Sequence, residues 1–160
     1  AKRGHTVAIH SASHKYNQIY TSEQAFFDDL EQMNSIIKAQ TGNDASIIRF
    51  PGGSSNTVSK DYCPGIMTQL VNDVTARGLL YCDWNVSSGD ANSKPISTEQ
   101  VVQNVISGVQ SHNVSVVLQH DIKDFSVNAV EQIIQWGQAN GYTFLPLTTS
   151  SPMSHHRVNN

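Results

Sequence analysis

Three consecutive stretches decide the fold: Thr-Val-Ala-Ile-His (6–10), a long helical segment (22–40) and Ser-Ile-Ile-Arg-Phe (46–50). The two short runs are apolar and contain β-branched residues, which is typical of buried strands. Between them, apolar side chains recur at spacings of three and four, which predicts a helix with one buried face. Ser22 is placed to cap the start of this helix, and Gly42 follows its end.

The alternation of strand and helix continues along the chain. Helices are predicted at 67–77, 98–110 and 127–138, and strands at 79–82, 114–118 and 142–145. Thr98 is expected to cap the helix that begins there. This order is the signature of parallel βα units in an open sheet or a barrel. Polar residues follow the carboxyl ends of the strands, where α/β barrels build their active sites.

Composition limits the classes of protein. The chain has 160 residues, of which 38% are hydrophobic and 14% charged, so one domain with a real core is expected. A formal net charge of −3 gives no electrostatic reason to expect nucleic acid or an anionic membrane as a partner. No apolar run approaches the ~18 residues of a membrane span, and no export signal precedes the first strand. Cys63 and Cys82 are too few for a disulfide framework, although one bridge between them stays open.

Two histidines follow the first predicted strand, in His10-Ser-Ala-Ser-His14. At this spacing both side chains can turn toward one metal ion if the chain curls after the strand. A pair of polar loop histidines is the plainer interpretation, and a catalytic zinc usually takes three protein ligands. Four further histidines have no such context and are expected at the surface: His5, His112, His155 and His156.

Other strand ends carry side chains that are suited to chemistry. Arg49 leads into the turn Pro-Gly-Gly (51–53), whose backbone N–H groups can face a ligand, and Arg49 itself can hold a carboxylate. Asp83 can support a histidine, and Trp84 offers a flat face to a sugar ring. His120 can act as a general acid beside a carboxylate. Structural interpretations stay open for each: an exposed turn, a packed tryptophan and a histidine that closes the barrel.

Taken in order, these pieces resemble the polysaccharide deacetylase family (the NodB-homology domain, carbohydrate esterase family 4). The run Gly4–Ser11 is similar to the family's GH-x-φ-x-x-H-[ST] strand, and His10-Ser-Ala-Ser-His14 is similar to its metal motif. Arg49-Phe-Pro-Gly-Gly53 resembles the R-x-P-x-G motif in the form common in bacterial peptidoglycan deacetylases. Asp83-Trp84 resembles the fourth motif and Leu118-Gln-His120 the fifth.

The resemblance implies a role for each matched residue. His10 and His14 would bind a divalent metal, zinc first, with cobalt or another divalent ion as alternatives. His120 would protonate the leaving amine, and Asp83 would hydrogen-bond His120 and raise its basicity. Arg49 would orient the carboxylate of the catalytic base.

The implied reaction is the metal-assisted hydrolysis of an N-acetyl amide. The backbone N–H near Gly52 would help the metal to stabilise the oxyanion. Trp84 and Leu118 would line the pocket for the acetyl methyl group.

The implied fold is a distorted parallel (β/α) barrel of the NodB type over residues 1–147, followed by a polar tail at 148–160. The family's first motif, of the form T-F-D-D-G, supplies the catalytic base and the third metal ligand, and nothing here matches it. Asp28-Asp29 lies inside a predicted helix and is not counted as this motif. The barrel would therefore lack its first βα unit, and its exposed strand edges would favour a strand swap or a homodimer.

The expected function is the removal of N-acetyl groups from a bacterial cell-wall polysaccharide, outside the cell or in its envelope. The Pro-Gly-Gly turn and a tail (151–160) similar to that of clostridial-type members favour peptidoglycan over chitin oligomers and xylan esters. A non-catalytic carbohydrate-binding or inactive relative stays open, because the two aspartates are missing. A serine hydrolase that uses Asp83 and His120 is disfavoured, since no G-x-S-x-G turn occurs.

Overall fold

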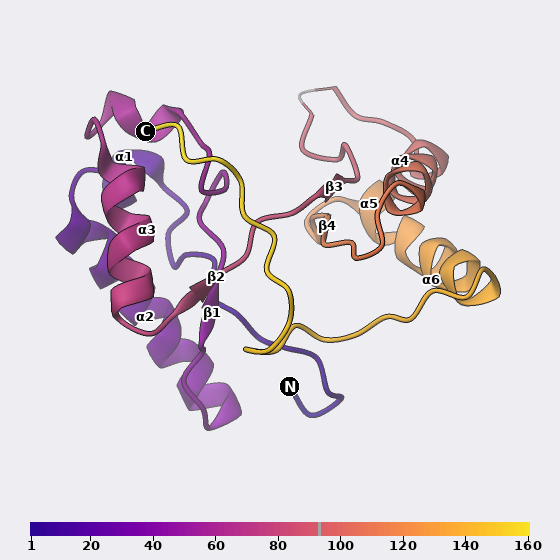
Figure 1. Cartoon of the computed structure of the whole chain (residues 1–160), viewed down its shortest axis with the longest axis horizontal. Coiled ribbons are helices and arrows are strands. Elements are labelled where there is room, and N and C mark those ends of the chain that lie inside the picture. The colour runs from indigo at the N-terminus through magenta and orange to yellow at the C-terminus, as the bar shows by residue number, and fades with distance from the viewer. Residues whose placement is uncertain (93) are drawn as a thin grey trace. The chain divides into compact units, whose positions relative to one another are not determined.

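The computed structural model describes residues 1–92 and 94–160 and divides into two compact units (Figure 1). Unit 1 consists of residues 1–83 and 146–160, and unit 2 of residues 84–145. Each unit has its own hydrophobic core. Residues 148–160, which were expected to form a separate polar tail, all belong to unit 1.

Unit 1 contains helices α1 (Tyr16–Ile19), α2 (Glu23–Thr41) and α3 (Ile66–Ala76), and the 3₁₀ turn η1 (Val58–Asp61). The two longer helices confirm the predictions at 22–40 and 67–77. Ser22 caps α2 by accepting a hydrogen bond from the N–H of Ala25 at 3.1 Å, and Gly42 ends it in the left-handed conformation. Helix α1, one short turn before α2, has no periodicity that could have predicted it.

The strands of unit 1 are short and parallel. Strand β1 (Ile47–Ile48) pairs with β2 (Leu80–Tyr81), and Ile9 forms a single parallel bridge with Ile48. The first three predicted strands are therefore neighbours, in the order Ile9, β1, β2. Within the predicted strands, the paired residues are Ile9, Ile47–Ile48 and Leu80–Tyr81.

The core of unit 1 forms between these strands and the helices, which lie to one side of β1 and β2 in Figure 1. Phe26 and Leu30 of α2 and Leu70 of α3 are buried there, as the helical spacing predicts. Phe26 stacks on Tyr20 and contacts Phe50, with ring centroids 6.1 and 5.4 Å away. This aromatic cluster joins α2 to the segment that follows β1.

Unit 2 contains β3 (Val86–Ser87), α4 (Thr98–Gln110), β4 (Val117–Leu118), α5 (Asp124–Val127) and α6 (Ala129–Ala139). Strands β3 and β4 are parallel, with Val86 opposite Val117. Helix α4 packs on β3 and α6. Gly108 allows α4 to approach β3 closely, since a Cβ at this position would lie 2.4 Å from the side chain of Val86.

Several sequence predictions for unit 2 need correction. Ser97, rather than Thr98, caps α4 by accepting from the N–H of Gln100. Strand β3 was not predicted, because two residues inside a polar run show no alternation. The strand predicted at 142–145 is absent from the described residues. This segment instead folds back on α6: the Phe144 ring covers Gly137, and the N–H of Tyr142 donates to the carbonyl of Gly137. Leu145 consequently stays 80% exposed.

The described strands form two separate two-stranded sheets. The fold is thus mixed α/β with parallel pairing, as predicted, but the described residues do not form a closed barrel.

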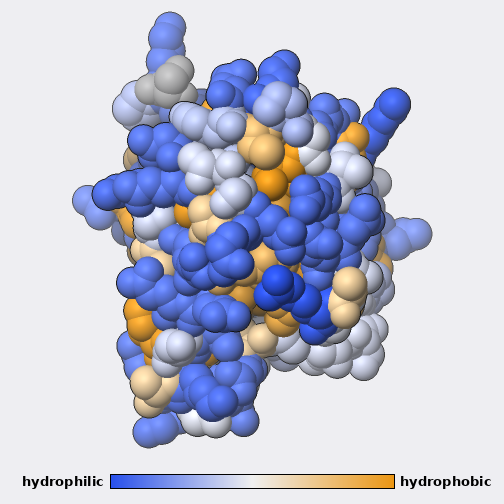
Figure 2. Space-filling view, turned by 90° about the vertical axis from the view of Figure 1, so that its left-hand side faces the viewer, coloured by the Kyte–Doolittle hydropathy of each residue, from blue (hydrophilic) through white to orange (hydrophobic). Residues whose placement is uncertain are grey.

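No helix within residues 1–92 and 94–160 is long and apolar enough to cross a membrane. Cys63 and Cys82 are both free thiols. Hydrophilic residues predominate on the face in Figure 2.

The C-terminal segment is held along unit 1. Asp83 N–H donates to the carbonyl of Ser154 at 2.7 Å, and His155 stacks on Tyr81 with ring centroids 4.0 Å apart. Asn160 lies at the start of α3. Its side-chain oxygen accepts a hydrogen bond from the N–H of Gly65 at 2.8 Å, and its backbone carbonyl accepts one from the N–H of Thr68 at 2.7 Å. The segment therefore supplies the cap that Gly65 cannot provide for itself.

We expect Asn160→Ala to destabilise the chain, because it removes the bonds of this side chain to Gly65 and to the hydroxyl of Ser59. Loss of a helix cap costs about 1–2 kcal/mol, which should lower the melting temperature by about 2–8 °C. Asn159→Ala is the matched control, since Asn159 is exposed and makes one long bond of 3.4 Å. Equal melting temperatures for the two variants would contradict the capping role.

Candidate active site

Backbone pairing brings three predicted site residues of unit 1 to one edge. Arg49 N–H donates to the carbonyl of Ile9 at 2.8 Å, and Cys82 N–H donates to that of Ile48 at 2.9 Å. His10, Arg49 and Asp83 are the residues at the carboxyl ends of the three neighbouring segments. Because parallel strands end at the same edge, one short sheet positions all three.

His10 and His14 lie together, with ring centroids 4.9 Å apart. Two imidazoles on one tetrahedral metal ion have centroids about 5 Å apart, so the pair fits a shared ion. His10 Nδ1 lies 2.8 Å from the carbonyl oxygen of Arg49. Since a carbonyl only accepts, Nδ1 must donate, so the acceptor nitrogen of the neutral ring is Nε2.

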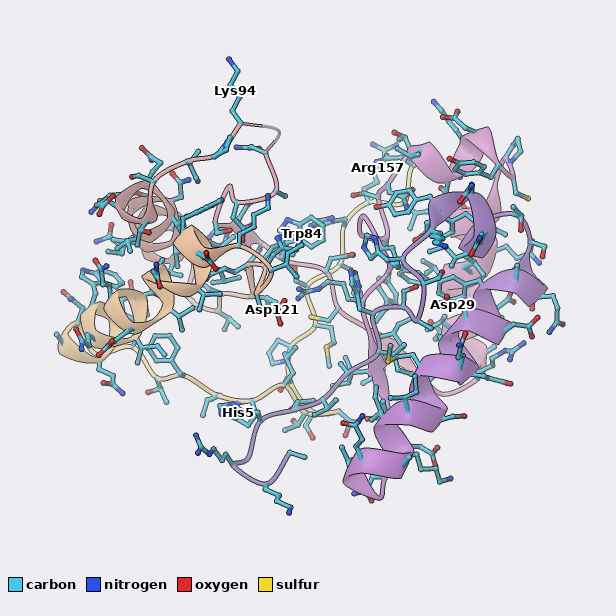
Figure 3. All side chains as sticks on the ribbon, turned by 180° about the vertical axis from the view of Figure 1, so that it is seen from behind. His5, Asp29, Trp84, Lys94, Asp121 and Arg157 are labelled. Atoms are coloured by element: carbon cyan, nitrogen blue, oxygen red, sulfur yellow. The ribbon has the colours of Figure 1, made fainter. Side chains whose placement is uncertain are left out.

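The turn between the two histidines is fastened to helix α2. Asp29, labelled in Figure 3, accepts hydrogen bonds from the Ser11 hydroxyl at 2.6 Å and from the N–H groups of Ala12 and Ser13 at 2.9 Å each. The Ser11 oxygen in turn accepts from His14 N–H at 2.8 Å. Partial burial alone would raise the pKa of Asp29, but these hydrogen bonds outweigh it and hold that pKa below its ordinary value.

No group of three or more potential metal-ligating side chains occurs within residues 1–92 and 94–160. Within these residues, His10 and His14 are therefore only a candidate pair of ligands. Its ring spacing and the tautomer of His10 both suit zinc or a similar divalent ion.

Gly52 lies in the turn after Arg49 and has a φ of 77°, which favours glycine. A Cβ at this position would lie 2.5 Å from the hydroxyl oxygen of Tyr16, so the backbone is approached closely. Tyr20 fixes the same turn by donating its hydroxyl to the carbonyl of Pro51 at 2.7 Å. Arg49 donates to the carbonyl oxygens of Cys82 and Asp83 at 3.0 and 3.2 Å.

Asp83 is fully buried, and its carboxylate makes its hydrogen bonds to residues of unit 1. Its carboxylate accepts from both the N–H and the hydroxyl of Ser54, and from the N–H of His156 at 2.9 Å. It thus ties the Pro-Gly-Gly turn to the C-terminal segment. His156 also contacts the Ser55 hydroxyl at 3.0 Å, so it is more than the plain surface residue expected from the sequence.

The carboxylate that bonds His120 is Asp90. Asp90 is 2% exposed and accepts from His120 Nδ1 at 2.8 Å, from His120 N–H at 2.7 Å and from the Ser126 hydroxyl at 2.6 Å. Burial opposes the ionised form, but the bonds from Ser126 and His120 hold the pKa of Asp90 below its ordinary value. The expectation that Asp83 orients His120 is corrected accordingly.

Asp90 was missed because it stands in the polar run Ser-Ser-Gly-Asp (87–90), which resembles an ordinary turn. A strand at β3 would have been the signal, since it would have placed the run at a carboxyl end. Trp84, labelled in Figure 3, and Leu118, the last residue of β4, are both half-buried. Their proposed contact with an acetyl group stays a prediction.

Comparisons with known proteins find relatives of one family. Residues 1–63 match the family model described as polysaccharide deacetylase. A peptidoglycan-N-acetylglucosamine deacetylase of Bacillus cereus is 29% identical over 145 residues, which cover 88% of this chain and 50% of that protein. The chain therefore spans half the length of this curated relative.

Two solved structures add to this. One, the catalytic domain of a peptidoglycan N-acetylglucosamine deacetylase from Eubacterium rectale, is 99% identical, with a TM-score of 0.98 over 99% of this chain and 72% of that one. A carbohydrate esterase of family 4 from Streptococcus mutans is 27% identical, with a TM-score of 0.74 over 91% of this chain and 64% of that one. With these matches and the histidine pair at a strand end, the chain belongs to the polysaccharide deacetylase family.

Proposed function

We propose that this chain forms part of a divalent-metal-dependent enzyme that removes N-acetyl groups from the N-acetylglucosamine of bacterial peptidoglycan. The observation that carries the proposal is the pairing of His10 and His14, whose ring centroids lie 4.9 Å apart at the end of a strand segment. The names of two similar proteins, both peptidoglycan N-acetylglucosamine deacetylases, support this choice of substrate. A cell-wall substrate places the enzyme outside the cell or in its envelope.

His10 and His14 would hold the ion, and zinc fits this pair of nitrogen ligands. When bound, the ion polarises the acetyl carbonyl and lowers the pKa of water. We assign the catalytic base and the third ligand to no residue of this chain. The N–H at Gly52 would donate to the oxyanion, and Arg49 would orient the base, as the family resemblance implies.

His120 would deliver the proton to the leaving amine. Because the lowered pKa keeps Asp90 ionised, Asp90 can only accept, so His120 Nδ1 must carry a hydrogen. Nε2 is then the nitrogen that exchanges a proton with the substrate. Trp84 and Leu118 would contact the acetyl methyl group and the sugar.

A carbohydrate-binding protein without catalysis is the second candidate. The absence of a three-residue metal-ligating group from the described part of the chain favours it. The two candidates share a fold and differ in whether a metal produces turnover.

Acetate release from an N-acetylglucosamine oligomer separates the two candidates. We expect release by the enzyme of which this chain forms part when zinc or cobalt is added, and none with a chelator. Release that is indifferent to metal would contradict the metal assignment. No release with any metal, together with retained binding of the oligomer, would establish the second candidate.

His10→Ala and His14→Ala should each weaken zinc binding by more than the roughly 10–100-fold that loss of a supporting residue costs. A competition titration with a zinc chelator measures this change. His5→Ala is the control, because His5 is exposed and lies before the first strand segment. Unchanged affinity in both test variants would refute the site.

Asp90→Asn should invert the tautomer of His120. The amide oxygen would keep the bonds from His120 N–H and Ser126, so the NH₂ group would face Nδ1 and force the ring hydrogen onto Nε2. Nitrogen NMR of the histidine rings reports this change directly. Acetate release should fall by roughly 10²–10⁴-fold.

Asp121→Asn is the matched control for this variant, since Asp121 is adjacent to His120 and exposed. Both readouts should match those of the unmodified chain. An unmodified chain that already carries its hydrogen on Nε2 would contradict the role given to Asp90.

A further inference from the structure

We propose that Asp29 positions the two metal-ligating histidines, by setting the turn between them before any ion binds. The proposal rests on the assignment of His10 and His14 as ligands. Its basis is the set of bonds from Ser11, Ala12 and Ser13, the three residues that separate the histidines, to one carboxylate on α2.

These bonds restrain the whole turn. One carboxylate oxygen of Asp29 accepts from the Ser11 hydroxyl and from Ala12 N–H, and the other accepts from Ser13 N–H. Hydrogen bonds to an ionised acceptor are about twice as strong as neutral ones. A segment of three residues with three such bonds to one rigid helix has few other conformations.

The turn needs this restraint because His14 adopts an unfavourable backbone conformation. Its φ is 54°, and it is the only residue other than glycine with a positive φ in the described parts of the chain. A left-handed conformation is costly for a residue with a side chain. The bond from His14 N–H to the Ser11 oxygen maintains it, and that oxygen is itself held by Asp29.

Helix α2 presents Asp29 rigidly. Phe26 and Leu30, three residues before it and one after, are buried in the core of unit 1. Asp29 therefore sits at the border of the buried face, half exposed, where it can reach the turn. With both oxygens engaged by the turn, Asp29 supports the histidines and is not itself placed as a ligand.

The neighbouring carboxylate provides a matched control. Asp28 is exposed and accepts one bond, from Gln24 one helical turn earlier. Asp28→Asn and Asp29→Asn make the same chemical change in the same helix. In Asp29→Asn the new amide can accept through its oxygen but not through its nitrogen, so at least one bond of the turn must be lost.

The first measurement uses the chain without metal. Amide hydrogen exchange at Ala12, Ser13 and His14 should become about tenfold faster or more in Asp29→Asn, and should stay unchanged in Asp28→Asn. The melting temperature of each variant shows whether the rest of the fold persists. Wild-type exchange at these amides in Asp29→Asn would overturn the proposal.

The second measurement is a titration with cobalt, whose visible spectrum reports the geometry of its ligands. Asp29→Asn should bind cobalt about 10–100-fold more weakly, with an altered spectrum, and Asp28→Asn should match the wild type. Equal affinity and spectrum in both variants would overturn the proposal while the metal site stands. A wild-type chain that binds no cobalt would instead refute the assignment of the histidines, and this proposal with it.

Discussion

Parallel pairing between Ile9, β1 and β2 is the constraint on which the rest of unit 1 depends. Each of these segments contributes only one or two paired residues. The pairing nevertheless brings His10, Arg49 and Asp83, which follow the three segments, to the same edge of the sheet. It also places the carbonyl of Arg49 against the ring of His10. A backbone carbonyl thereby selects the tautomer of the neutral His10 ring.

Three aspartates share a design. Asp29, Asp83 and Asp90 each accept three or more hydrogen bonds, largely from backbone N–H groups and serine hydroxyls. Burying a carboxylate is costly unless such bonds replace water. Each of the three fastens a different polar loop to the packed part of its unit: the histidine turn, the Pro-Gly-Gly turn and the loop of His120.

This arrangement separates two tasks within the chain. The histidines matched to the family motifs, His10, His14 and His120, are exposed or half-exposed. Asp29 accepts hydrogen bonds from the turn between His10 and His14, and the buried Asp90 accepts from Nδ1 of His120. Loops with few apolar residues can then carry chemistry, because their conformation is decided by charged hydrogen bonds rather than by a core.

The sequence by itself determined the α/β class, the long helices and the candidate ligands His10 and His14, because helical periodicity and motif spacing are local properties. It did not reveal that β3 exists, that residues 142–145 fold back on α6, or that Asn160 caps α3. Those outcomes depend on which segments meet, so only the tertiary structure decided them. The same reason explains the partners of the candidate site: Asp90 rather than Asp83 bonds His120, and Asp29, set aside as an ordinary helix residue, bonds the turn between His10 and His14. A carboxylate in a polar run or on a helix looks the same in sequence whether it faces water or a loop that lies far from it along the chain.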